Sequence, residues 1–430
     1  MNHLRRSTRG MVVLFVITST LVSCTGDDVK VTPTERPMAE FMTDRWIDLP
    51  ASPLGEWDRY NWVYLADRSG FVHAGAASAA GDGKVRSTPA AAYFSFAERR
   101  FLRLPDLPVT GGVGRAGGAW VGDTLVVVGQ DCPPSPGYSG VGVEFCAAGG
   151  EGAKVVLTLE RGAPRWRRWD VPEWMQEFRQ GTPDVLGVLD GAVVVASGHV
   201  PAHLGAFDPS TGEWTRLPDV PKLMNRYEPA PGTDPAVASF GAISAQPCIV
   251  GGVLVAVMLG DAPSVMSFPE GQPLPDRPAH WFRLDGDTFV EVPAPITGPI
   301  TNVACLHDGF LVSRAIDTGV LGEVNLSWVD PAAGSADLLD ENAHLGPSYS
   351  EATAFADAAL MQPPVEVNPA GTPPGTYRVA TAGGMVDTDL DRIDVYAPIT
   401  VVGSYAIWQN DLNGVPRTSD APRIAKLGFG

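Results

Sequence analysis

The sequence predicts an all-β fold of many short antiparallel strands. Its 430 residues include 48 Gly and 39 Pro, while 44% of the residues are hydrophobic and only 19% are charged. Gly and Pro interrupt helices, so their spread along a chain of ordinary hydrophobicity favours strands joined by turns. Two sequence units recur along the chain, an apolar hairpin and an aromatic strand that exits through proline, and they support the same prediction.

Residues 1–23 are predicted to be a secretory signal peptide. Arg5, Arg6 and Arg9 form a basic start, and an apolar run follows from Met11 to Val22. Such a run is too short to span a membrane as a stable helix but suits an export signal. We therefore expect the remainder of the chain to be exported.

Cys24 is predicted to carry a lipid. Small residues precede it directly after the apolar run, and this arrangement resembles the lipobox of bacterial lipoproteins. The resemblance implies diacylglyceryl transfer to the Cys24 thiol, cleavage before Cys24, and an acyl chain such as palmitate or a free amine on its nitrogen. An ordinary secretory signal with a chance cysteine is the alternative. Residues 24–41 are polar with scattered prolines, typical of a flexible tether. We therefore expect a protein anchored by lipid on the extracytoplasmic face of the bacterial cell membrane.

Residues 42–430 are predicted to repeat one hairpin, whose strands we call A and B. A Gly or Asp in its turn supplies the positive φ that tight hairpin turns require. The second strand is a continuous apolar run, typical of strands that are buried on both faces. The hairpins begin near residues 62, 119, 187, 248, 304, 354 and 400.

Two more strands follow each hairpin. Strand C comes after a long connection and turns directly into strand D, which begins with an aromatic residue and exits through proline. The clearest D strands are Trp46–Pro50, Phe101–Pro105, Trp214–Pro218 and Phe289–Pro293, with weaker copies at Trp166–Pro172 and Arg392–Pro398. Four antiparallel strands repeated about every 45–70 residues are typical of the blades of a β-propeller.

Seven hairpins predict a seven-bladed β-propeller over residues 42–430. The last blade has no D strand of its own, whereas Trp46–Pro50 is a D strand with no blade before it. We therefore expect the N-terminal strand to complete the seventh blade and to close the ring, because closure leaves no large exposed sheet edge. Six blades, with one weak hairpin misread, is the alternative.

The stretch from Asp208 to Pro218, together with its weaker copies, resembles the repeat of kelch-type propellers. The resemblance covers residues 46–430. Kelch propellers mostly bind proteins or glycans, and a minority of them are enzymes. The resemblance therefore implies a binding module, with an enzyme as the less common outcome.

Four further cysteines are disulfide candidates in an exported protein, and three pairings are open. These cysteines are Cys132, Cys146, Cys248 and Cys305. Cys132 and Cys146 flank a Pro/Gly-rich loop that a short bridge would close. Cys248 and Cys305 share one register in neighbouring A strands, and they can bridge only if their Cα atoms come within about 7 Å. Otherwise they are buried thiols.

The net charge of −18 makes nucleic acid a poor partner, because an acidic surface repels phosphate backbones. No residue is predicted to be catalytic, and no metal or cofactor is expected, because the common nucleophile, phosphate-loop and metalloprotease motifs are missing from the sequence. His199 and His203 form a close pair, but they lie in a Gly/Pro loop, where we expect them at the surface. Calcium binding is the alternative to solvent exposure for four aspartates that alternate along a predicted polar loop before a D strand. They are Asp387, Asp389, Asp391 and Asp394.

Function is predicted to reside on the face that carries the B–C and D–A connections. The A–B and C–D turns are short, whereas the other connections hold long segments such as 130–152 and 218–247. Long loops on a rigid scaffold usually carry binding residues. Residues near the start of A strands would lie closest to the channel mouth. We therefore expect ligand contacts at Arg115, Arg226, Tyr227, Asn302, Tyr349 and Glu351.

Two functions follow from these patterns. The first is a monomeric, lipid-anchored extracytoplasmic propeller that binds a protein or a glycan through this face. The alternative is an extracytoplasmic enzyme that acts on glycans or small molecules at the channel mouth. An enzyme would bring polar groups with shifted pKa values together in one pocket, whereas a binder would present a broad surface with exposed aromatic residues. The missing catalytic motifs favour the binder.

Overall fold

The structure is a computed structural model, and it describes the part of the chain that forms the sheets. The described residues are 46–49, 53, 62–67, 69–79, 86–109, 113–131, 153–176, 183–197, 203–224, 242–244, 246–259, 279–298, 300–315, 323–344, 357–361, 376–391, 399–408 and 423–427. The signal peptide and tether expected at 1–41, with Cys24, lie outside these residues. The described elements are almost all β-strands, as the sequence predicts.

The first three blades are four-stranded antiparallel sheets in chain order. Blade 1 consists of β2 (Trp62–Asp67), β3 (Gly70–Ala79), β4 (Arg86–Ser95) and β5 (Arg100–Arg103). Blade 2 consists of β6 (Val113–Val121), β7 (Thr124–Asp131), β8 (Ala153–Glu160) and β9 (Arg167–Asp170). Blade 3 consists of β10 (Pro183–Leu189), β11 (Ala192–Ser197), β12 (His203–Phe207) and β13 (Trp214–Arg216). In each blade, the four strands are strands A to D of the predicted repeat.

The next three blades continue the pattern. Blade 4 consists of β16 (Gln246–Val250), β17 (Val253–Leu259), β18 (Ala279–Asp285) and β19 (Thr288–Val292). Blade 5 consists of β20 (Ile300–Cys305), β21 (Phe310–Ala315), β22 (Glu323–Asp330) and β23 (Ser335–His344). Blade 6 has three strands among the described residues, namely β24 (Ala359–Met361), β25 (Thr376–Thr381) and β26 (Gly384–Asp391).

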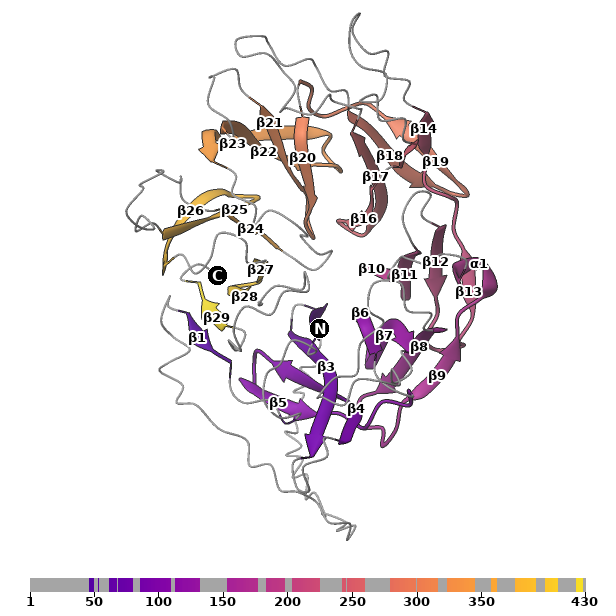
Figure 1. Cartoon of the computed structure of the whole chain (residues 1–430). Helices are drawn as coiled ribbons and strands as arrows, with labels where there is room; N and C mark the ends of the chain where they lie inside the picture. Colours follow the sequence, from indigo (N-terminus) through magenta and orange to yellow (C-terminus); the bar gives the residue numbers. More distant parts are fainter. Residues whose placement is uncertain are drawn as a thin grey trace, which may run out of the picture. The chain divides into compact units, whose positions relative to one another are not determined.

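Blade 7 closes the ring with a strand from the other end of the propeller sequence. It consists of β27 (Ile399–Val402), β28 (Tyr405–Trp408), β29 (Arg423–Lys426) and β1 (Ile47–Asp48), with β1 hydrogen-bonded to β29. Ile47 pairs with Ile424 and Asp48 with Arg423, and the Arg423 Nε donates to the Asp48 carboxylate over 3.2 Å. The prediction that the N-terminal strand completes the seventh blade is therefore confirmed. The chain is a seven-bladed β-propeller, and Figure 1 shows its blades following one another around a ring.

The hydrophobic core is divided among the blade interfaces. The buried side chains of the described residues form seven clusters, and each cluster joins two neighbouring blades. The cluster around Phe71, Phe94 and Ile424 joins blade 1 to blade 7, so the closing interface is packed like the others. Apolar burial on both sides of every blade is what holds a ring of separate sheets together.

Strand β7 shows why the B strands are continuous apolar runs. Successive side chains in a strand point to opposite faces. Leu125 and Val127 pack into the cluster shared with blade 1, whereas Val126 and Val128 pack into the cluster shared with blade 3. Every position of such a strand therefore needs an apolar side chain, as the uninterrupted sequence pattern predicts.

Blade 6 departs from the sequence prediction in its D strand. The first strand of its expected hairpin near residue 354 lies outside the described residues. The D strand is β26, not the segment Arg392–Pro398, which follows it. Asp387 and Asp389 are therefore strand residues rather than loop residues, and their side chains are exposed while Leu390 is buried. The aspartates that alternate in the sequence mark the outward positions of a strand, because its side chains have a period of two.

Two small elements were not expected from the sequence. The helix α1 (Glu173–Gln176) follows strand D of blade 2, and a separate two-stranded sheet of β14 (Lys222–Met224) and β15 (Ala242–Ser244) stands between blades 3 and 4 in the chain. Among the residues that the structure describes, no helix is long and apolar enough to cross a membrane.

Candidate functional site

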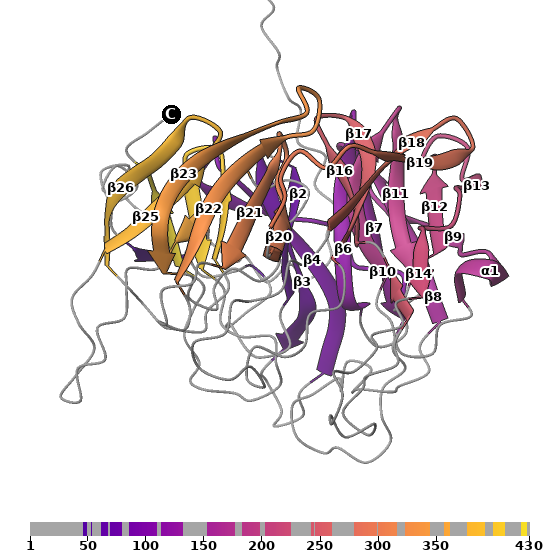
Figure 2. The same cartoon turned by 90° about the horizontal axis from the view of Figure 1, so that it is seen from above.

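The antiparallel order of strands gives each blade two distinct ends. The A–B and C–D turns lie at one end, which we call the short-turn end, and the B–C and D–A connections start from the other, which we call the long-connection end. Figure 2 shows the strands from the side, running between these two ends. Strands A of neighbouring blades lie side by side along the inside of the ring, and strands D lie outside.

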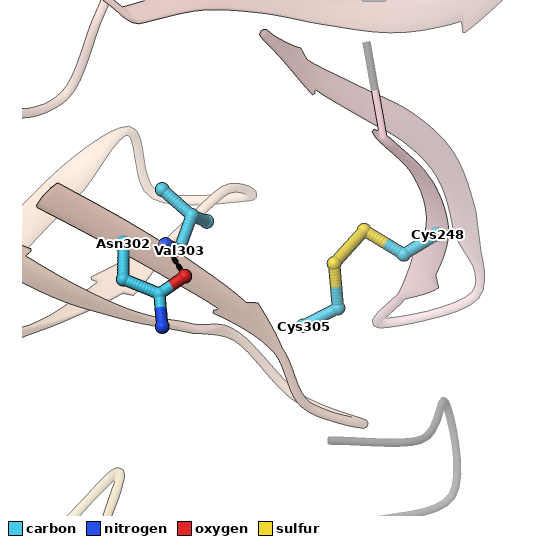
Figure 3. Close-up of a disulfide and its surroundings, with 4 residues drawn as sticks. All are labelled: Cys248, Asn302, Val303 and Cys305. Carbon is cyan, nitrogen blue, oxygen red and sulfur yellow. Dashed lines mark hydrogen bonds between the residues drawn. A yellow bond between two sulfur atoms is a disulfide. The ribbon is translucent and has the colours of Figure 1, made fainter. Parts of the chain in front are cut away.

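Two of the six predicted ligand residues fall among the described residues. Arg115 lies in β6 and Asn302 in β20, so both belong to A strands, as expected, but in blades 2 and 5. The half-buried Asn302 accepts a hydrogen bond from the backbone N–H of its neighbour Val303 at 2.9 Å (Figure 3), which is a local structural contact. The other four lie outside the described residues: Arg226, Tyr227, Tyr349 and Glu351.

A group of polar side chains lies at the long-connection end of blade 3. His203 opens β12, and its Nδ1 lies 2.9 Å from the Asp219 carboxylate. Arg216, the last residue of β13, donates to the same oxygen over 3.3 Å. The His203 side chain is 15% exposed, whereas those of Asp219 and Arg216 are 45% and 51% exposed. We call these three residues, together with Trp174, the blade 3 cluster.

Trp174 joins this cluster from the neighbouring blade. It lies in α1, and Lys154 holds the helix by donating to the Met175 carbonyl over 2.8 Å. The Trp174 indole packs edge-on against Trp214, with ring centroids 6.4 Å apart, and an added Cβ on Gly205 would lie 2.9 Å from it. The Arg216 guanidinium lies 5.6 Å from the centre of the same indole, within the range of a cation–π contact.

The electrostatics of the blade 3 cluster favour a charged carboxylate. Partial burial raises the pKa of Asp219, but the hydrogen bonds and charges of His203 and Arg216 outweigh it, so that the pKa lies below its usual value. The cluster therefore presents an ionised carboxylate beside an imidazole, a guanidinium and an indole. These groups provide hydrogen-bond donors, hydrogen-bond acceptors and an aromatic surface for a ligand.

The same cross-strand arrangement recurs in other blades, and sequence reasoning missed it. In blade 4, His280 of strand C lies 2.8 Å from the Glu291 carboxylate of strand D. A basic residue of strand C also contacts an acidic residue of strand D in blade 6, between Arg378 and Asp387, and in blade 7, through Arg423. Such pairs stabilise adjacent strands. Their sequence signal is a basic residue near the start of strand C and an acidic residue in or just after strand D.

The Arg216–Asp219 pair has a counterpart in blade 1. Arg103 donates to Asp106 over 3.2 Å, also three residues further on, and both pairs stand in the sequence Arg-Leu-Pro-Asp at the exit of strand D. Their exposure is similar, since the Arg103 and Asp106 side chains are 47% and 56% exposed. Blade 1 therefore contains the ion pair in the same sequence context, away from His203 and Trp174.

A disulfide joins blade 4 to blade 5. It links Cys248 of β16 to Cys305 of β20, whose Cα atoms are 6.3 Å apart (Figure 3). Both residues are buried in the cluster between the two blades. The Cα atoms therefore lie within the distance of about 7 Å that this bridge requires. Cys132 and Cys146 lie outside the described residues.

Similarity to known proteins is found among solved structures. No protein-family model and no curated protein matches the chain. A polysaccharide lyase, an ulvan lyase of family PL25, is similar over 90% of this chain and 95% of its own, with 8% identity and a TM-score of 0.43. The β-propeller domain of the Trilobed protease from Pyrococcus furiosus, described as having an open velcro topology, is similar over 81% of this chain and 91% of its own, with 8% identity and a TM-score of 0.41.

Proposed function

We propose that the chain is a lipid-anchored, extracytoplasmic propeller that binds a protein or a glycan through its long-connection end. The observation that carries this proposal is the blade 3 cluster, where Trp174, His203, Arg216 and Asp219 meet at that end. Aromatic residues and arginine are enriched where proteins bind ligands and partners. The ligand is met by this cluster and by the connections that start from the same end.

A kelch-type repeat is part of the proposal. The C–D turn of blade 3 begins at Asp208, whose carboxylate accepts hydrogen bonds from the backbone and hydroxyl of Ser210. Gly212 ends the turn with a φ of 79° and donates to the Asp208 carbonyl. The turn of blade 5 repeats this geometry from Asp330 to Gly334, with φ of 62° at the glycine. An Asp-Pro-x-x-Gly turn thus recurs between strands C and D of two blades, and this recurrence supports a kelch-type repeat.

The second candidate function, an extracytoplasmic enzyme, is favoured by one specific observation. Among the residues that the structure describes, two histidine–carboxylate pairs lie at the long-connection end, His203–Asp219 and His280–Glu291. A carboxylate that orients an imidazole is a recurring element of general acid–base catalysis. The two pairs stand in different blades, and each imidazole also matches the cross-strand pairing of strands C and D. These pairs are therefore explained by strand pairing without catalysis, and we prefer the binding function.

Ligand binding is tested with the chain produced from residue 25. This protein is screened on a glycan array and used in pull-downs from cell envelopes. Arg216→Ala removes one partner of Asp219 and the cation over Trp174, and we expect it to weaken ligand binding at least about tenfold, because charged hydrogen bonds at binding sites commonly contribute that much. Arg103→Ala is the matched control, since it breaks the same type of ion pair in blade 1. Equal losses in the two variants would assign the ligand to another part of the protein.

The same protein, incubated with the ligand that it captures, distinguishes binding from catalysis. A binder releases every captured glycan or protein unchanged, as measured by mass spectrometry after long incubation. An enzyme converts the ligand, and His203→Ala or His280→Ala then lowers the rate more than the affinity. Conversion of the ligand by the unmodified chain contradicts the non-catalytic proposal.

The predicted ligand residues provide a second test of the functional end. Alanine at Arg115 or Asn302, and at the four predicted residues outside the described part, is expected to weaken binding with little change in melting temperature. The controls at the short-turn end are Asp123, Asp190 and Asp285. Larger losses of binding in these controls, without unfolding, would place the ligand at the short-turn end instead.

The anchor is tested at Cys24. Cys24→Ala is expected to abolish labelling by a radioactive or clickable fatty acid, because the thiol is the acceptor that the lipobox resemblance implies. The unmodified chain is expected in the membrane fraction and the variant outside it. Labelling that persists in the variant contradicts the lipoprotein proposal and leaves the binding proposal to be judged by its own experiments.

A further inference from the structure

At the short-turn end, hydrogen bonds link blade 4 to blade 5 and blade 6 to blade 7. The Gly251 N–H of blade 4 donates to the His307 carbonyl of blade 5 over 2.8 Å. The Asp357 N–H of blade 6 donates to the Val401 carbonyl of blade 7 over 2.9 Å, and the Gly403 N–H returns a hydrogen bond to the Asp357 carboxylate. Between these two linked pairs lies the interface of blades 5 and 6.

Three side chains with metal-binding atoms meet at this interface, at the short-turn end. They are His307 and Asp308, from the A–B turn of blade 5, and Asp357, which lies just before β24 of blade 6. One ligand atom from each, an imidazole nitrogen and two carboxylate oxygens, lies within 4.8 Å of the other two. The His307 Nδ1 is 2.5 Å from the Asp308 carboxylate. The His307 and Asp308 side chains are 39% and 59% exposed, so a cation has access from solvent.

The spacing of these atoms suits a first-row divalent cation. Zinc binds imidazole nitrogen and carboxylate oxygen at about 2.0–2.2 Å, which places two tetrahedral ligands about 3.4 Å apart. Ligand atoms within 4.8 Å of one another reach that spacing through small side-chain rotations. Two carboxylates that converge on one point also repel each other, and a bound cation offsets this repulsion by attracting both. The imidazole favours zinc over calcium and magnesium, which prefer oxygen ligands, and the two carboxylates also suit manganese.

The backbone around these residues is well held. Cys305, two residues before His307, is linked by the disulfide to blade 4, and the His307 carbonyl accepts from Gly251. Asp357 is held by both its N–H and its carboxylate against blade 7. Ligands that are fixed before the metal arrives lose little conformational entropy on binding it.

We propose that His307, Asp308 and Asp357 form a binding site for Zn²⁺ or Mn²⁺ that joins blade 5 to blade 6 at the short-turn end, with water completing the coordination. The ion continues the series of links around this part of the ring, after the disulfide between blades 4 and 5. It stabilises the interface with blade 6, whose described sheet has three strands. A metal at this site differs from the expectation drawn from the sequence, and its binding is independent of the ligand at the other end.

The test uses the full chain, freed of metal with a chelator, and isothermal titration calorimetry with Zn²⁺, Mn²⁺, Ca²⁺ and Mg²⁺. We expect Zn²⁺ or Mn²⁺ to bind one to one and to raise the melting temperature, because a ligand that binds only the folded state stabilises it. His307→Ala and Asp357→Asn each lower the affinity at least about tenfold, since even the loss of a group that only supports a ligand costs about 10–100-fold. Asparagine keeps a side-chain acceptor for the Gly403 N–H, so Asp357→Asn retains the link to blade 7.

Two matched controls separate this site from others. Asp123→Asn changes an A–B turn carboxylate that pairs with Arg161 in blade 2, and His280→Ala removes an imidazole that pairs with a carboxylate in blade 4. Neither is expected to change the metal affinity. Cobalt bound to the unmodified chain provides a readout that needs no variant, because its visible spectrum reports imidazole and carboxylate ligation. The proposal is overturned if Zn²⁺ and Mn²⁺ do not bind one to one, or if only Ca²⁺ or Mg²⁺ binds. It is also overturned if the His280→Ala control loses as much metal affinity as His307→Ala.

Discussion

His73 is a buried histidine in a strand made mostly of apolar and small residues. It lies in β3 of blade 1, is fully buried, and its ring centroid is 6.1 Å from that of Phe101. Burial lowers the pKa of His73 from 6.5 to about 3, because a charged imidazole loses its hydration there. The residue is therefore neutral in the folded protein across the physiological range, and it makes folding sensitive to acid.

The first prediction follows from the sign of this shift. Between about pH 6.5 and pH 3, His73 is protonated in the unfolded chain but neutral in the folded chain. The free energy of unfolding therefore falls as the pH drops through this range. At pH 5 the loss from this residue is about 2 kcal/mol. In urea unfolding at pH 7 and pH 5, His73→Asn should show a smaller loss of stability than the unmodified chain. An identical pH dependence in the two proteins would mean that the pKa of His73 is the same in the folded and unfolded states.

Within single blades, an aromatic residue of strand C lies across a glycine at the start of strand B. In blade 1 the Tyr93 ring covers Gly70, and its hydroxyl lies 2.6 Å from the Ser69 hydroxyl. In blade 5 the Trp328 indole covers Gly309 in the same way, within 2.6 Å of where a Cβ would stand. Both rings are buried between their blade and a neighbour. The glycines are needed because a ring occupies the place of a side chain.

The second prediction concerns Gly70. A Cβ there would lie 2.1 Å from the Phe94 carbonyl oxygen, a backbone atom that no change of rotamer can move. Gly70→Ala is therefore expected to destabilise the fold by about 1–3 kcal/mol, as overpacking of a core usually does. Gly383→Ala is the control, since its nearest neighbour would be the Thr381 hydroxyl at 3.7 Å. Thermal unfolding compares the two, and equal melting temperatures would show that blade 1 relaxes around the added methyl group.

Closure of the ring depends on a strand of two residues and on the side chains beside it. Ile47 and Leu49 pack into the cluster between blades 7 and 1, whereas Trp46 packs into the cluster between blades 6 and 7, edge-on to Tyr377. Burial of one large apolar side chain contributes about 1.5–3 kcal/mol. Leu49 is buried, whereas Ile47 and Trp46 are half-buried and each contribute less than this. Their sum is still a sizeable part of the net stability of a domain, about 5–15 kcal/mol.

The third prediction is that deletion of residues 42–50 causes cooperative loss of stability or aggregation. The deletion removes these apolar contacts and leaves the hydrogen-bonding edge of β29 exposed, which favours pairing with other chains. Asp48→Ala is the control, because it removes only the exposed ion pair with Arg423, worth less than about 1 kcal/mol. Calorimetry and light scattering measure both effects. A deletion variant that melts like the unmodified chain would show that the ring is stable without its closing strand.

The fourth prediction concerns the disulfide between blades 4 and 5. It closes a loop with a sequence separation of 57, for which the chain-entropy model gives about 4 kcal/mol. The Cys248→Ala/Cys305→Ala double variant should therefore unfold at a lower denaturant concentration than the unmodified chain. Peptide mapping without reductant checks the pairing itself, and a Cys132–Cys248 link would contradict it.

The blade repeat could be predicted because its signals are local. The A–B turns, the apolar B strands and the proline exits of strand D each follow from the conformation of a few consecutive residues, and the missing last D strand pointed to closure. The location of the D strand of blade 6 was predicted wrongly, because aspartates that alternate along β26 look like a polar loop when the partner strand is unknown. The shared register of Cys248 and Cys305 was visible, but the pairing required their distance.

The sequence by itself determined the fold class, the seven blades and the strand that closes the ring, because repeated short-range patterns and the burial of apolar strands specify them. Only the tertiary structure decided which polar residues meet. His203 and Asp219 come together across two strands, Trp174 joins them from the helix that follows blade 2, and Asp357 reaches His307 from the next blade. These contacts depend on how strands pair and how blades pack, and no spacing along the chain encodes those distances.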